Sequence, residues 1–186
     1  LVRLGEASGE ARWTDMAVDT ANILLTRFSD PHNGGFFSTG NDAEALITRP
    51  KDLFDNAHPS ANSLASLALL RLGALTGEGR FTDAAESVLR SLGENATSHP
   101  TAFGRLFEAL DLYHSGTTEV VVTGTRADLV SAVTSSYRPN TVLAWGERRS
   151  GPLWDGRTGN QAWVCRDQTC RAPVTTTEEL LTELDG

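Results

Sequence analysis

The sequence lacks a long apolar run and an excess of basic charge. No stretch approaches the roughly 20 apolar residues that a transmembrane helix needs, so we expect no membrane span. The 186 residues hold 16 Lys and Arg against 24 Asp and Glu, which gives a formal net charge of −8. Because nucleic-acid binding needs a basic surface, this balance argues against a general nucleic-acid-binding protein.

Cysteine is also scarce, with two residues in the whole chain. This argues against a secreted domain built on disulfides and favours a reducing, cytoplasmic location. The first residues show no basic segment followed by an apolar one, so we expect no signal peptide. The sequence begins at Leu1 rather than at a methionine, and we interpret it as a fragment of a longer protein.

The spacing of apolar residues predicts helices at 8–28, 60–76, 80–93 and 100–114. The first and third carry a single apolar stripe, whereas the second and fourth are apolar on nearly every side. Alternating amphipathic and buried helices with short connections are typical of two layers of antiparallel helices. The predicted fold class is therefore mainly α, a partial α/α toroid over residues 1–116, with a polar loop at 30–62.

After Gly116 the pattern changes to short β-branched runs. Strands at 119–123 and 141–145 flank a helix at 126–137, which predicts a βαβ unit with parallel strands. Strands at 161–165 and 170–174 and a closing helix at 177–184 complete the prediction. We expect residues 117–186 to form a small α/β C-terminal segment.

Four segments, GGFF, RPKDLFDNAHPSANS, VVVTG and QAWVCRDQTCRAPVTTTEEL, occur in this order. Together they resemble the C-terminal part of the thioredoxin-domain-containing proteins whose animal members are called spermatogenesis-associated proteins. The resemblance covers residues 30–184. It implies the end of a six-hairpin-glycosidase-like barrel plus an α/β segment, with an N-terminal thioredoxin-like domain as partner. Such barrels resemble sugar hydrolases and sugar epimerases, which is an analogy of fold.

The loop at 30–62 holds the densest polar chemistry in the sequence. We predict Asp55 as a catalytic acid or base and a set of substrate-binding residues around it. The predicted substrate-binding residues are Phe36, Arg49, Lys51, Asn56, His58, Ser60 and Asn62. The structural alternative is that Asp55 and Ser60 cap the following helix and Arg49 pairs with a carboxylate. Residues 34–37 could form a short strand with 45–48 as its partner.

A glycosidase needs two placed carboxylates, and no spacing singles out a second one among the candidates Asp42, Glu44, Asp52 and Glu108. An epimerase could use His58, His99 or His114. The family usually has Gly where Asn56 and Ala61 stand and a small or apolar residue at His58, so no catalytic role is transferred to His58. No cofactor and no metal site are predicted.

Cys165 and Cys170 are separated by four residues. They could form a redox pair that exchanges with a thioredoxin-like partner, or a cross-strand disulfide if both lie on one hairpin. We favour two reduced structural cysteines, because the spacing differs from the C-x-x-C of oxidoreductases. Among the tryptophans, Trp154 is the best candidate for a carbohydrate-stacking platform.

Two hypotheses for function follow. In the first, the barrel portion binds a small polar, carbohydrate-like ligand and works with the thioredoxin-like domain, as a sugar-active or redox-linked enzyme. In the second, it is a non-catalytic helical scaffold for protein interaction. The first predicts a deep polar pocket containing Asp55. The second predicts that the side chains of Asp55 and Ser60 form local capping hydrogen bonds and line no pocket. Uncovered apolar faces also predict that the fragment self-associates.

Overall fold

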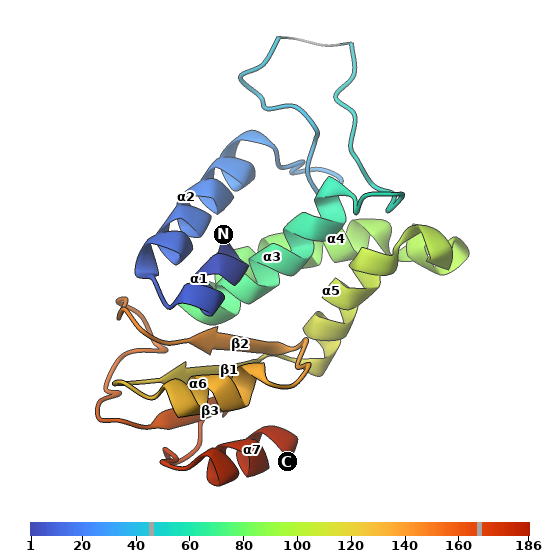
Figure 1. The fold of residues 1–186 in the computed structure, drawn as a ribbon. Coiled ribbons are helices and arrows are strands. Elements are labelled where there is room, and N and C mark those ends of the chain that lie inside the picture. The colour runs from blue at the N-terminus through green and yellow to red at the C-terminus, as the bar shows by residue number, and fades with distance from the viewer. Residues whose placement is uncertain (45–46, 167–168) are drawn as a thin grey trace. The chain divides into compact units, whose positions relative to one another are not determined.

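The computed structural model describes residues 1–44, 47–166 and 169–186 and divides into two compact units (Figure 1). Both units are discontinuous in sequence, and three helices contribute residues to each, namely α2 (Ala11–Arg27), α3 (Ala61–Thr76) and α5 (Gly104–Ser115). The helical unit comprises Ala17–Gly73 and Glu78–His114, and the sheet unit comprises Leu1–Met16, Ala74–Gly77 and Ser115–Gly186. The domain boundaries at 116 and 117 stay a prediction.

All four helices expected from periodicity are present, as α2 (Ala11–Arg27), α3 (Ala61–Thr76), α4 (Gly79–Ser98) and α5 (Gly104–Ser115), with a 3-10 turn at Pro100–Ala102. The sequence did not predict α1 (Val2–Ser8). This helix ends at Gly9, whose φ of 70° is left-handed and suits glycine. The break explains why α2 begins at Ala11 instead of residue 8.

The core of the helical unit is centred on the apolar stripe of α4. Phe81, Ala85, Val88 and Leu92 are at most 1% exposed. The expectation that α3 is buried on every face is wrong, because Leu64 is 47% exposed. Instead, the N-terminal half of α3 buries polar side chains on its inner side, namely Asn62, Ser63 and Ser66.

The sheet unit contains a four-stranded mixed sheet in the order β2-β1-β3-β4. Its elements are β1 (Thr118–Val122), α6 (Ala127–Thr134), β2 (Thr141–Ala144), β3 (Ala162–Arg166), β4 (Thr169–Cys170) and α7 (Thr177–Asp185). The pairing of β1 with β2 is parallel, which confirms the βαβ unit, while β3 pairs antiparallel with both β1 and β4. The predicted strand at 170–174 is shorter than expected, since only an isolated bridge from Val174 to Ala162 continues it beyond Cys170.

Both faces of this sheet are covered, as alternation along the strands requires. Val120, Val122 and Val164 pack with Leu129 of α6 and Leu180 of α7. The opposite face buries Val121, Val142 and Ala144 against Leu153 and Trp154 from the loop after β2. Trp154 is only 5% exposed, so its predicted role as a carbohydrate platform is wrong.

The fold class is therefore mostly helical with a small mixed sheet, as the sequence predicted at this coarse level. Closure of the helices into a toroid stays a prediction. Within the described residues, no helix combines the length and apolar character needed to cross a membrane.

Candidate functional site

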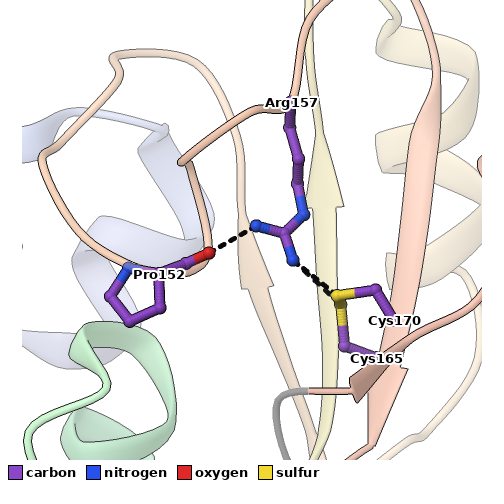
Figure 2. The surroundings of a disulfide bond; sticks show 4 residues. All are labelled: Pro152, Arg157, Cys165 and Cys170. Carbon is purple, nitrogen blue, oxygen red and sulfur yellow. Dashed lines mark hydrogen bonds between the residues drawn. A yellow bond between two sulfur atoms is a disulfide. The ribbon is translucent and has the colours of Figure 1, made fainter.

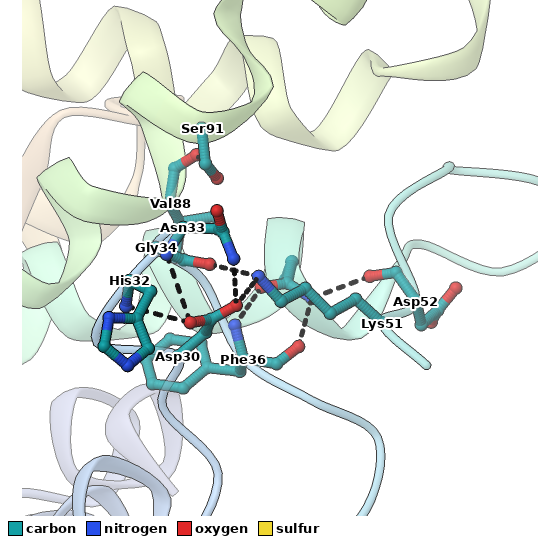
Figure 3. Close-up of polar contacts among 10 residues, drawn as sticks. Asp30, His32, Asn33, Gly34, Phe36, Lys51, Asp52, Val88 and Ser91 are labelled. Carbon is teal, nitrogen blue, oxygen red and sulfur yellow. Dashed lines mark hydrogen bonds and ion pairs between the residues drawn. The ribbon is translucent and has the colours of Figure 1, made fainter. Parts of the chain in front are cut away.

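The polar loop of the helical unit is organised around Asp30, which is not among the predicted site residues (Figure 3). The Asp30 carboxylate is buried and lies 2.7 Å from Lys51 Nζ. It also accepts backbone hydrogen bonds from His32 at 2.9 Å and Asn33 at 3.1 Å. Lys51 above all, and then these amides, hold the pKa of Asp30 well below its ordinary value.

Lys51 and Arg49 both bind carbonyl oxygens of the loop itself. Lys51 Nζ donates a hydrogen bond of 2.6 Å to Gly34 O. Arg49 Nη2 donates to the carbonyls of Arg27 and Thr39, rather than to the carboxylate that the structural alternative expected. Both cations also lie against the Phe37 ring, with the Arg49 guanidinium carbon 4.2 Å from its centroid. These contacts fold the loop onto itself.

Asn62 fixes the loop to the start of α3. Its Oδ1 accepts a hydrogen bond of 2.7 Å from Phe36 N, and its Nδ2 donates to Phe36 O at 2.9 Å and to Asp52 O at 2.8 Å. The side chain is fully buried, and Phe36 is 4% exposed. A Cβ on Gly35 would lie 2.8 Å from Asn62 Oδ1, and the φ of Gly35 is 73°. Glycine is therefore required for this close approach.

Asp55, the predicted catalytic residue, accepts hydrogen bonds from three backbone amides. Its Oδ1 accepts from Ser60 N at 2.7 Å, and its Oδ2 accepts from Arg105 N at 2.8 Å and Leu106 N at 3.3 Å. The last two amides lie in the first turn of α5, where the backbone donors lack helical partners. Asp55 thus caps α5, whereas the structural alternative expected it to cap α3.

The start of α3 is capped by two other side chains. Ser60 Oγ accepts a hydrogen bond of 3.1 Å from Ser63 N and donates one of 2.8 Å to Ser63 Oγ. Asp52 Oδ2 accepts from Ala61 N at 2.8 Å. Asp52 was considered only as a possible second carboxylate of a glycosidase. Its position ahead of a predicted helix was the signal for a cap.

The remaining predicted residues do not converge on a common point. Asn56 and His58 are exposed and form a local turn, in which Asn56 N donates to His58 O at 2.9 Å. Asp42 and Glu108 pair with Arg27 and Arg105. Glu44, His99 and His114 are exposed. Phe36 forms an isolated bridge with Ser29. Residues 45–46 of the predicted strand 45–48 lie outside the described part of the chain. No cluster of metal-ligating side chains occurs among the residues that the structure describes.

The two cysteines are the second polar feature, and here the prediction of reduced thiols is wrong. Cys165 and Cys170 face each other across β3 and β4 and form a disulfide (Figure 2). Cys165 is fully buried and Cys170 is partly exposed. The guanidinium of Arg157 donates to the sulfurs, at 3.7 Å to Cys165 Sγ and in closer contact with Cys170 Sγ. Sequence reasoning missed Arg157, which lies in a loop without a motif.

Comparison with known proteins gives a partial match. No protein-family profile matches the chain. It is 32% identical to spermatogenesis-associated protein 20 of Homo sapiens over 97% of this chain and 25% of that protein, and 32% identical to the Rattus norvegicus protein over the same shares. An uncharacterized protein of Caenorhabditis elegans is 28% identical over 97% of this chain and 26% of its own length.

The class of this chain is that of a mostly helical protein with a small mixed sheet, and the comparisons show that it is distantly homologous to part of a longer chain. The particular relative is spermatogenesis-associated protein 20, and this chain spans about a quarter of its length. The resemblance seen in the sequence is confirmed at that level. The assignment of this quarter to the end of a barrel stays a prediction.

Proposed function

We propose that the helical unit is a non-catalytic scaffold that completes an α/α barrel within a longer protein similar to spermatogenesis-associated protein 20. The observation that carries the proposal is that the Asp55 carboxylate accepts hydrogen bonds from Ser60 N, Arg105 N and Leu106 N. A general acid or base must reach a substrate proton through a free oxygen. Both oxygens of this carboxylate instead accept hydrogen bonds from backbone amides of the loop and of the first turn of α5.

The neighbouring polar residues support the same proposal. Lys51 binds Asp30 and Gly34 O, Asn62 binds the Phe36 backbone, and Ser60 binds Ser63. A substrate-binding site keeps some polar groups directed into a cavity. In this loop these groups are directed at the backbone and at one another, so the loop holds the ends of helices together.

Exposed apolar side chains of the helical unit support its place in a larger assembly. Ile23 is 52% exposed, Leu64 47%, Phe54 46% and Phe107 39%. Because the homologous protein is about four times as long, the occupant that we propose for these surfaces is the preceding part of the same chain. The proposed thioredoxin-like domain rests on the resemblance alone, and the proposed cytoplasmic location rests on the scarcity of cysteine.

The test compares the intact parent protein with this chain. We expect no thermal shift of the parent with a panel of sugars and sugar phosphates, and we expect the chain alone to self-associate in light scattering. Leu64→Asn should reduce this association, whereas substitution of the exposed, polar Thr97 by Asn should not. A sugar-induced shift of the parent that Asp55→Asn abolishes would overturn the scaffold proposal.

A second candidate function is binding of a small polar, carbohydrate-like ligand beside Arg49. It is favoured by Arg49 Nε, which is buried without a hydrogen-bond partner among the described residues. A ligand hydroxyl or carboxylate could accept this bond. The expected result is a thermal shift with one member of the panel that is lost in Arg49→Ala and kept in Arg27→Ala, whose side chain pairs with Asp42.

A further inference from the structure

Arg157 differs from other arginines of the sheet unit because its guanidinium contacts sulfur. Arg126, Arg149 and Arg171 each form an ion pair with a carboxylate. Among the described residues, the hydrogen bonds of the Arg157 side chain go to the carbonyl of Pro152 and to the sulfurs of the disulfide (Figure 2). A cation directed at sulfur is the arrangement that stabilises a thiolate.

The surroundings of the disulfide and of Arg157 are also partly buried. Cys165 lies opposite Glu119 across the β1–β3 ladder, and Glu119 is 3% exposed. Burial lowers the pKa of Arg157, while the charges of Asp155 and Glu119 act in the opposite direction. The guanidinium is thus held partly out of water, where its interaction with an anionic sulfur is stronger than at an open surface.

We propose that Cys165 and Cys170 form a redox-active thiol–disulfide pair that is reduced by a dithiol, with Arg157 stabilising the thiolates that leave. The proposal goes beyond the scaffold function of the helical unit, because it concerns the sheet unit. The electron donor is defined by its chemistry, as two neighbouring thiols on a protein or a small molecule.

Exposure determines the order of the steps. A donor thiolate attacks the partly exposed Cys170 Sγ, the Cys165–Cys170 bond breaks, and Cys165 leaves with the electron pair. The second donor thiolate attacks the donor sulfur of the mixed disulfide, and Cys170 leaves as a thiolate in contact with Arg157. Two electrons pass from donor to pair. The donor becomes a disulfide and releases its two thiol protons. Cys165 takes up one of these protons, and the other enters solvent.

The first experiment measures the equilibrium of the folded protein with dithiothreitol and the rate of reduction, by trapping free thiols. We expect Arg157→Met to lower the equilibrium constant for reduction about tenfold, which corresponds to about 30 mV for two electrons. Arg157→Lys should restore part of the loss because it keeps the charge. Arg171→Met is the matched control, because Arg171 follows Cys170 but pairs with Glu183. It should leave both quantities unchanged.

The second experiment does not depend on any Arg157 variant folding. In Cys165→Ser the remaining Cys170 should react with a thiol-specific disulfide reagent at least about ten times faster than Cys165 does in Cys170→Ser. Equal reactivity of the two cysteines would overturn the proposed order of attack. A disulfide that dithiothreitol does not reduce in the folded protein, or equal equilibrium constants for Arg157→Met and wild type, would show a purely structural crosslink.

Discussion

The polar loop of the helical unit and the disulfide of the sheet unit both concentrate polar chemistry, but they use it differently. In the loop, Asp55 and Asn62 bind backbone amides and carbonyls, and Lys51 binds a carboxylate and a carbonyl. At the disulfide, Arg157 binds atoms that can change their oxidation state. The density of polar residues in a sequence therefore indicates chemistry less well than the identity of the atoms that each side chain contacts.

The comparison can be tested through stability and reactivity together. Substitutions in the loop should change the free energy of unfolding and leave the disulfide equilibrium unaltered. Substitution of Arg157 should change the disulfide equilibrium and have a smaller effect on the free energy of unfolding. A loop variant that keeps its stability but loses a ligand response would break this contrast.

The largest loss of stability is expected for Lys51→Met, which leaves the buried Asp30 carboxylate without its cation. The pKa of Asp30 in the folded protein lies below its ordinary value of 3.8. Its stabilising contribution is therefore complete above pH 3.8 and is lost as the pH falls below 3.8 through the folded-state pKa. Urea unfolding across this range should show a difference between wild type and variant that is largest near neutrality and shrinks in acid.

Arg126→Met is the control for that pH dependence, since Arg126 pairs with the exposed Asp128. The pKa of Asp128 is lowered to about 2, chiefly by Arg126. The contribution of this pair to stability is therefore also lost as the pH falls. An exposed pair contributes little, and we expect a small difference over the same window. A pH-independent difference for Lys51→Met would contradict the assigned role of Asp30.

The next effect in size is expected for Asn62→Ala, at about 3 kcal/mol of unfolding free energy. The substitution leaves the buried N–H and C=O of Phe36 and the carbonyl of Asp52 without their side-chain partner. Asn33→Ala is a suitable comparison, because Asn33 is exposed and its side chain makes one hydrogen bond of 3.2 Å. Similar losses for both variants in urea denaturation would argue against Asn62 as the fixed point of the loop.

Asp55→Ala should lower the free energy of unfolding by about 2 kcal/mol, because the first turn of α5 loses its cap. Hydrogen exchange should locate the effect at the amides of Arg105, Leu106 and Ser60. In Asp42→Ala, an exposed carboxylate that pairs with Arg27 is removed, and we expect about 0.5 kcal/mol or less. Unchanged exchange at these three amides in Asp55→Ala would contradict the capping role.

The helices α2 to α7 and the parallel β1–β2 pair could be predicted from the sequence because each depends on local periodicity, whereas the short α1 could not. The caps could be predicted only in part. Thr176 and Glu179 form a capping box within four residues, which is a local pattern. Asp55 caps a helix that begins about 50 residues later in the sequence, and no local pattern carries that pairing.

The disulfide shows the same limit. The spacing of Cys165 and Cys170 allowed a cross-strand bond, but composition favoured reduced thiols, and the hairpin register that places them opposite each other is a tertiary fact. Arg157 reaches the sulfurs from a loop that covers one face of the sheet. The chemistry of this pair therefore depends on a contact between segments that no motif connects.

Apart from the control variants, the smallest change in stability is expected for Arg157→Met, at about 1 kcal/mol, because the lost bond to Pro152 O is a single hydrogen bond of a half-buried group. Methionine largely reproduces the length of the Arg157 methylene chain, so most of the side-chain volume is kept. Urea unfolding of the oxidised protein measures this loss of stability. The equilibrium with dithiothreitol, measured on the same sample, gives the change in the equilibrium constant for reduction. If the variant loses several kcal/mol of stability with no change in that equilibrium, Arg157 belongs with Asp55 as a structural residue, and the contrast between the two regions is lost.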